Sequence, residues 1–283
     1  MRRPLILTGM AVLMSLSVHA SGSESESGSG PGFGGSQSPR TPQQLVAEMI
    51  ANENAAEAKH DRYEYIAQER SDRTGGHLWT ELIVETAPGR MRRLLAVDGK
   101  PLDADRAAQE KARLDLLAAH PEIFIKHEQG VRAEEKRARE MLDVLPKDFL
   151  FENVLLQNGV WTMDFKPNPD YTPNGIEERV LHNMAGRLVI NAQDLRLAHM
   201  EFHMTRDLAI GFGLVADVHP GTSFVSDRQI LDGRWHTVHV ATQVRAKAVL
   251  FKTVNLQLDL TRSAFKVLDH DLSVPEAVAL LEK

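Results

Sequence analysis

A long run of short β-prone segments constrains the fold of this chain more than any other feature. The run extends from Phe149 to Leu260, and its segments are separated by Gly, Asn, Asp or Pro. Short segments broken by turn residues are typical of an antiparallel meander, in which successive strands pair with one another. The segments are DFLFENVLLQN, GVWTMDFKPN, GRLVINAQD, LRLAHMEFHMT, DLAIGFGLVADVH, TSFVSDRQI, RWHTVHVATQV and KAVLFKTVNLQLDL.

Apolar side chains occupy one face of several of these segments. From Leu208 to Val218, which we expect to be one strand, every second residue is apolar. Burial of one face is expected in an antiparallel sheet whose other face meets water. Gly211 and Gly213 lie within the same segment, and glycines inside strands permit strong bending. We therefore predict an α+β fold with a large curved antiparallel sheet, an open β-barrel whose concave apolar face is covered by helices.

A curved sheet with one apolar face must cover that face. Either helices fill it completely as a structural core, or they leave a cavity for an apolar ligand. For the second case the alternation predicts a set of concave, ligand-contacting side chains, some of them methionines, which adapt to irregular ligands. These candidates are Met200, Phe202, Ile210, Phe212, Leu214, Val254 and Leu256.

The N-terminus has the pattern of a cleavable signal peptide. Arg2 and Arg3 are followed by the apolar run Pro4–Val18, and Val18-His19-Ala20 supplies small residues at the positions that a signal peptidase reads, so we predict cleavage after Ala20. The run is short for a membrane span, although an uncleaved membrane anchor is the alternative. A Gly/Ser-rich linker follows at 21–40, so we expect one folded domain at 41–283, exported to the periplasm.

Composition excludes several classes of function. The formal net charge of −6 argues against nucleic acid as a partner, because phosphate binding needs a basic surface. The chain has no cysteine, which excludes a thiolate nucleophile, a Cys-ligated metal and a disulfide framework. We expect no cofactor.

The segments before the meander predict helices and three strands. Thr41-Pro42-Gln43-Gln44 is a capping signature for a helix over 42–58, and strands are expected at 62–70, 77–85 and 90–97. An Ala- and charge-rich insert at about 103–145 predicts two helices separated by Pro121 and Gly130, with thin apolar stripes. The dense charge on such helices indicates a face exposed to solvent; the alternative is that the helices form a movable lid over the sheet. A second capping signature at Ser273 predicts a last helix ending near Leu281.

Two groups of polar residues are candidates for chemistry. His199, Glu201 and His203 point the same way if they lie in a strand, and an alternating His pair can chelate zinc. These residues also fit the solvated face of a half-buried strand, so they are weak metal candidates. The segment DVHPGTS (217–223) contains Asp, His and Ser, but Pro220-Gly221 favours a plain turn, and no nucleophile elbow accompanies it. We predict no catalytic residue.

The order of elements resembles the LolA/LolB-like half-barrel group of envelope proteins. The resemblance rests on RRLLAVDGKPLDADRAAQEKARL (92–114), on GRLVINAQDLRLAHMEFHM followed by DLAIGFGLVADVHPGTSF, and on coverage of nearly all of 41–268. It is to exported bacterial proteins similar to outer-membrane lipoprotein-sorting proteins. The resemblance implies an open barrel that receives acyl chains.

Three functions follow as expectations. The first is a periplasmic, non-enzymatic carrier of an apolar ligand, a lipid or lipoprotein acyl chain. The second is an envelope protein-interaction or sensor module of the RseB type. The third is a metal-dependent enzyme using His199, Glu201 and His203.

Overall fold

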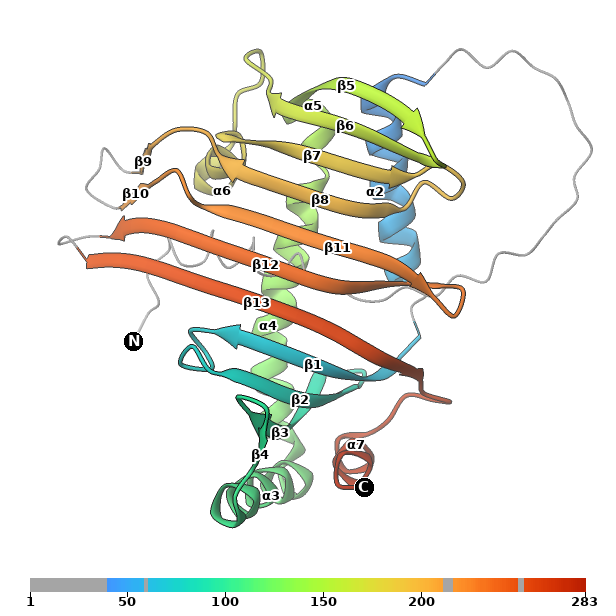
Figure 1. Ribbon diagram of the computed structural model, residues 1–283, viewed down its shortest axis with the longest axis vertical. Helices are drawn as coiled ribbons and strands as arrows, with labels where there is room; N and C mark the ends of the chain where they lie inside the picture. The colour runs from blue at the N-terminus through green and yellow to red at the C-terminus, as the bar shows by residue number, and fades with distance from the viewer. Residues whose placement is uncertain (1–39, 59–60, 211–215, 249–251) are drawn as a thin grey trace, which may run out of the picture.

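The computed structural model describes residues 40–58, 61–210, 216–248 and 252–283 (Figure 1). Within these residues the protein is α+β, with six helices and thirteen strands that belong to one antiparallel sheet. The helices are α2 (Pro42–Glu57), α3 (Ala104–Ala119), α4 (Pro121–Leu142), α5 (Leu145–Asp148), α6 (Gly175–Leu181) and α7 (Val274–Leu281).

Neighbouring strands are consecutive in the chain with two exceptions: the last strand pairs with the first, and the strand from Ser223 pairs with the strand from Leu197 because a short hairpin between them lies off the main path. They are β1 (Tyr63–Ser71), β2 (Leu78–Glu85), β3 (Arg90–Val97), β4 (Lys100–Pro101), β5 (Phe149–Gln157), β6 (Val160–Pro167), β7 (Met184–Asn191), β8 (Leu197–Met204), β9 (Leu208–Ile210), β10 (Ala216–Val218), β11 (Ser223–Leu231), β12 (Arg234–Ala248) and β13 (Lys252–Val267).

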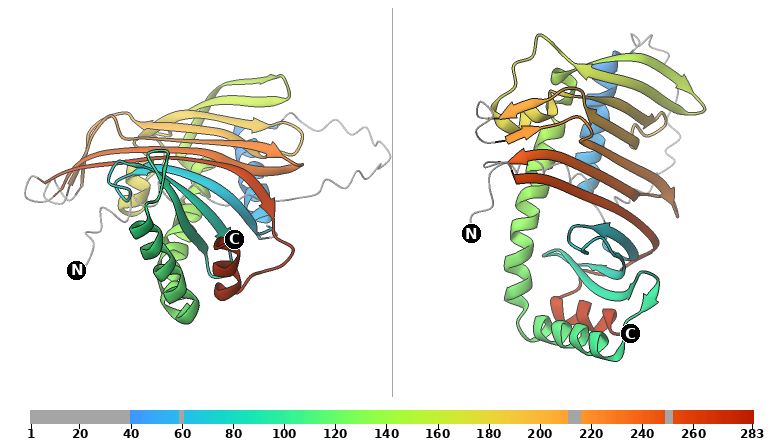
Figure 2. Two further views of the ribbon diagram at one scale, coloured as in Figure 1. Left: turned by 60° about the horizontal axis from the view of Figure 1, so that its bottom comes forward. Right: turned by 60° about the vertical axis from the view of Figure 1, so that its left-hand side comes forward.

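The spatial order of the main sheet is β4-β3-β2-β1-β13-β12-β11-β8-β7-β6-β5. The first strand of the chain therefore pairs with the last, with Tyr63 opposite Val267. Because β4 and β5 stand at opposite ends of this order, the sheet is open. It also curls, as Figure 2 shows.

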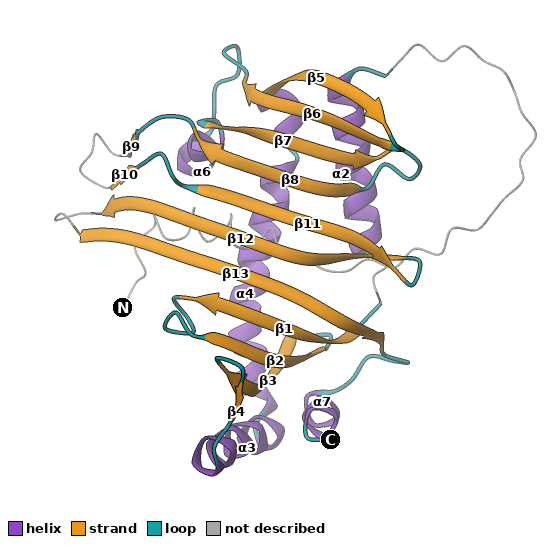
Figure 3. Ribbon diagram, in the orientation of Figure 1, coloured by secondary structure: helices purple, strands orange, loops and turns teal. Residues whose placement is uncertain are grey.

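Helices lie on the inner side of the curl and around the β3–β4 end. Figure 3 shows α2 and α4 crossing the strands steeply on one side of the sheet. Leu45, Val46, Met49 and Ile50 of α2 are buried in the main apolar core, together with side chains from β6, β7, β8, β11 and β12. At the other end α7 packs on the outer face of β2, in a second core that contains Val84.

The capping signatures predict both terminal helices correctly. Thr41 accepts from the backbone N–H of Gln44 and the Gln44 side chain accepts from that of Thr41, which is the expected capping box. Ser273 and Glu276 repeat this arrangement at α7. The strands expected at 62–70, 77–85 and 90–97 are also present, each within a residue of its predicted bounds.

Three expectations are wrong in detail. The segment from Leu208 to Val218 is not one strand, because β9 and β10 pair antiparallel with each other, with Ile210 opposite Ala216. The residues between them, which include Gly211 and Gly213, lie outside the described part of the chain. Gly130 does not end a helix, since α4 continues through it. The last strand extends beyond Leu260 to Val267 because it must pair along the whole of β1.

Candidate functional site

The inner face of the sheet has two chemically different halves. We call the part formed by β5–β12 and the start of β13 the apolar half. Predicted residues Met200, Phe202 and Ile210 lie there and are buried against the core. Phe202 stacks on Phe224 of the neighbouring strand, with ring centroids 4.9 Å apart. The alternation thus correctly predicts which face of β8 is buried.

One stripe of the apolar half remains partly exposed. Val254, Leu256 and Leu258 follow one another on the inner face of β13 and contact the main core, yet each is only partly buried. Val254 and Leu256 are among the predicted ligand-contacting residues. The two remaining candidates, Phe212 and Leu214, lie outside the described residues.

The part formed by β1–β3, which we call the charged half, carries ionised side chains on the same inner side. Glu69 and Glu81 are buried there at positions that the strand alternation would assign to apolar residues. The guanidinium of Arg73 bonds both carboxylates at 2.6 and 2.7 Å, and Arg92 reaches Glu81 at 3.3 Å. These charges are paired, as buried charges must be.

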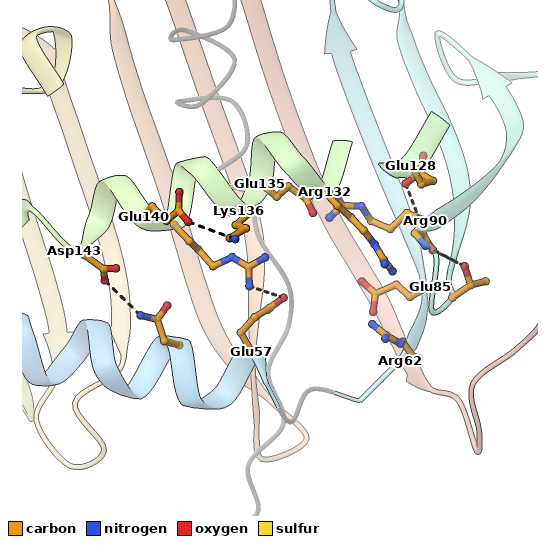
Figure 4. A pocket seen from close by; sticks show the side chains of 14 residues that line it. Glu57, Arg62, Glu85, Arg90, Glu128, Arg132, Glu135, Lys136, Glu140 and Asp143 are labelled. Atoms are coloured by element: carbon orange, nitrogen blue, oxygen red, sulfur yellow. Dashed lines mark hydrogen bonds and ion pairs between the residues drawn. The ribbon is translucent and has the colours of Figure 1, made fainter. Parts of the chain in front are cut away.

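A cleft of about 550 Å³ opens between α2, α4 and the β2–β3 hairpin. Figure 4 shows side chains from α4 pointing across it toward those of α2 and the strands. We call it the α4 cleft. Its lining is charged on every side: Glu57, Arg62, Glu85, Arg90, Glu128, Arg132, Glu135, Lys136, Arg139, Glu140 and Asp143, with Asn54, Thr86 and Gly89.

Charged contacts hold the middle of α4 over this cleft. Phe124 and Ala138 are buried near the two ends of the helix, whereas the buried residues between them are Glu128 and Glu135. Glu135 pairs with Arg90, and Glu128 accepts from the Arg90 backbone N–H at 3.3 Å. Burial opposes the charge of Arg90, but Glu135, together with Tyr65 and Glu85, outweighs burial and raises the pKa of Arg90.

Removing one of these carboxylates should loosen α4 locally. Glu135→Ala removes the carboxylate that pairs with the buried Arg90 guanidinium across α4, so we expect amide exchange in the middle of α4 to accelerate by roughly 10–100-fold. Hydrogen-exchange mass spectrometry measures this directly. Glu140→Ala is the control, because its partner Lys136 is exposed and such a pair contributes about 0–1 kcal/mol. Equal exchange in both variants would contradict the expectation.

The outer face of the sheet carries the predicted metal candidates. His199 and Glu201 lie on β8 beside Asp227 of β11, which accepts from both His199 at 2.7 Å and His239 at 3.0 Å. Burial works against this charge, but the two imidazoles lower the pKa of Asp227 below its ordinary value. His203 is exposed on the same face, without a contact to this group.

Neither polar candidate group assembles a reactive site in the described residues. The described part of the chain contains no group of three or more His, Asp or Glu side chains arranged to hold a metal ion. His219 bonds Asp207 at 2.8 Å and has no hydrogen bond to Ser223, so the 217–223 segment does not form a nucleophile and base pair.

The charged half is the feature that sequence reasoning missed. In β1, every second residue from Tyr63 through Tyr65 and Ala67 is buried, and Glu69 is the next residue in this series. The alternation in this strand therefore predicts that Glu69 is buried. The pairing of Arg90 with Glu135 joins residues on different elements, and no local pattern predicts it.

Comparison with known proteins finds no matching family model, no similar curated protein and no similar solved structure. None of the helices in the described residues is both long and apolar enough to span a membrane. Functional inference therefore depends on the geometry of this chain.

Proposed function

We propose that the protein is a periplasmic, non-enzymatic carrier that holds a lipid or a lipoprotein acyl chain against the apolar half of its inner face. One observation carries the proposal. The stripe Val254, Leu256 and Leu258 continues the apolar core on the inner face but keeps exposed area. Apolar surface at such a position favours binding of an apolar ligand, since burying it gains about 25 cal/mol per Å².

The composition of the surrounding core supports the same proposal. Met49, Met163, Met184, Met200 and Met204 all belong to it. Methionine is flexible and polarizable, so a core rich in it can rearrange around ligands of different shape. The LolA-like order of elements, an N-terminal helix, three strands, a helical insert and a long meander, fits a half-barrel of this kind.

The experiment is native mass spectrometry of the chain purified from a periplasm, with lipid extraction of the same sample. We expect an acyl lipid to co-purify, and we expect Leu256→Asp to reduce its occupancy at least tenfold because a carboxylate would face the acyl chain. Asn255→Asp is the matched control, since it adds the same charge to the adjacent, exposed residue on the opposite face of β13.

Two results would contradict the carrier proposal. One is a purified chain that contains no lipid, binds no hydrophobic dye and gains no thermal stability from added lipid. The other is equal lipid occupancy in the Leu256→Asp and Asn255→Asp variants, both folded by circular dichroism.

A protein-interaction module of the RseB type is a second candidate. The observation that favours it is the open edge of the sheet at β5, which ends the strand order. An open edge strand can accept a strand from another chain.

A further inference from the structure

The two edges of the sheet differ in how far other parts of the chain cover them. At the β3–β4 edge, α3 covers the strand: the backbone N–H of Leu94 donates to Glu110 at 2.8 Å, and Arg113 donates to the carbonyl of Arg92. The outermost strand there, β4, has two residues, one of which is Pro101 and lacks an N–H. Such devices prevent strand addition at that edge.

At the β5 edge nothing comparable is present among the described residues. Among the described residues no strand pairs with the outer side of β5; at its first residue, Phe149, the backbone N–H donates to the carbonyl of Leu145 in α5. Four of the nine large hydrophobic side chains exposed in the described residues lie on this one strand. Their concentration on an unpaired edge indicates a contact surface and not scattered surface residues. The four are Leu150, Val154, Leu155 and Leu156.

The geometry of the β5–β6 hairpin shows which backbone groups are free. Asn158 and Gly159 both have positive φ, 53° and 78°, as a two-residue type I′ turn requires. Gln157 and Val160 flank this turn and form its hydrogen-bonded pair, so Leu156 and Trp161 form the next, non-bonded pair. The N–H and C=O of Leu156 therefore point away from β6, toward the open edge.

A bulge limits the length of strand that can pair. The register shifts between Glu152 and Leu155, and Asn153 has a φ of 53°. Bulges interrupt ladders, so pairing is confined to the run from Val154 to Gln157. This run carries no charge, and the nearest charged residue, Glu152, is already bonded to Lys166.

We propose that a second copy of this chain occupies the β5 edge, with the two strands antiparallel about a two-fold axis at Leu156. In this register Leu156 faces Leu156 and Leu155 faces Gln157, so no charge meets a like charge. An uncharged apolar run is complementary to itself, which is what an isologous interface requires. Since few residues pair, the area buried is small and the dimer is weak and concentration-dependent. The inference does not depend on the carrier proposal.

Disulfide trapping tests both the occupant and the register. The chain has no cysteine, so Leu156→Cys introduces a single thiol. Residues facing each other in a hydrogen-bonded antiparallel pair have Cα atoms roughly 5.5 Å apart, within the range a disulfide spans. We expect oxidation to give a covalent homodimer. Ile230→Cys is the matched control, because Ile230 and Leu156 are each 51% exposed, and we expect it to stay monomeric.

Sedimentation velocity of the untagged chain provides the second test. We expect a monomer–dimer equilibrium that Leu156→Pro weakens at least tenfold without lowering the thermal midpoint, because the N–H it removes faces the open edge. A chain that stays monomeric at every concentration up to its solubility limit would overturn the proposal. So would a dimer unaffected by Leu156→Pro, or Leu156→Cys cross-linking only to a different protein.

Discussion

Replacing Glu53 with Gln is expected to destabilise the protein by about 3–5 kcal/mol, which is the cost of removing one charged partner from a buried ion pair. Glu53 projects from α2, and its carboxylate bonds Arg196 at 2.9 and 3.1 Å and also bonds Arg228. Both arginines are buried, so the variant would leave two guanidinium groups in the interior without an ion partner. Urea denaturation measures the loss as a lower midpoint with an unchanged slope.

Two further variants separate this mechanism from a general effect of mutating α2. Glu48→Gln removes an exposed ion pair with Arg40 on the same helix, and we expect a change of about 0–1 kcal/mol. Replacing Glu53, Arg196 and Arg228 together with apolar residues of similar size should recover most of the stability, since no charge is then stranded. A loss below about 1 kcal/mol in Glu53→Gln would show that the ion group does not fix α2.

The ion group of Glu53, Arg196 and Arg228 also predicts how the stability of the protein depends on pH. Burial alone would raise the pKa of Glu53, but Arg228 and Arg196 outweigh it and lower the pKa to about 2. Because the folded pKa lies below the unfolded value of 4.5, this stabilisation is complete above that value and is lost as the pH falls toward about 2. The loss should be absent in Glu53→Gln.

The second large effect is expected at Gly186, in the middle of β7. A Cβ at this residue would lie 1.9 Å from the backbone oxygen of Glu201 on the neighbouring strand β8. A backbone atom cannot move aside as a flexible side chain can, so Gly186→Ala must displace a strand. We expect the free energy of unfolding to fall by about 3 kcal/mol or more, the upper end of the range for overpacked cores. The shift of the denaturant midpoint measures this change.

Gly130→Ala is the matched control for this prediction. The added Cβ meets no atom within 4 Å, and the residue lies inside α4. Alanine is favoured over glycine inside a helix, so a gain of about 0.5–1 kcal/mol is expected. If Gly186→Ala proved as stable as the parent protein, the close approach of β7 and β8 would be wrong.

Local signals in the sequence predict much of this fold. Thr41 and Ser273 define the starts of the first and last described helices, and alternation identifies the buried face of β8 through Met200 and Phe202. Turn dipeptides such as Asp98-Gly99 are equally local, and both residues have the positive φ such a turn needs. These features depend only on residues close together in the chain.

Other features depend on which strands and side chains pair in the fold, and the sequence does not predict them. Apolar residues alternate evenly along Leu208–Val218, which is compatible either with one strand or with two strands that fold back on each other. Only the pairing of Ile210 with Ala216 shows that two strands form. The charged half was missed although the alternation in β1 places Glu69 on the buried face. Glu81 resembles an exposed residue until Arg73 and Arg92 are brought to it.

The pairing of β1 with β13 has a consequence for the order in which the protein can be assembled. A chain that emerges from its N-terminus holds β1–β3 long before β13 exists, and the ladder between Tyr63 and Val267 needs both. Contacts between distant residues slow folding, because a long loop must close before they form. Until synthesis delivers the last strand, the sheet stays in two pieces with exposed edges, a state prone to aggregation. A product truncated before Lys252 would remain in that state permanently.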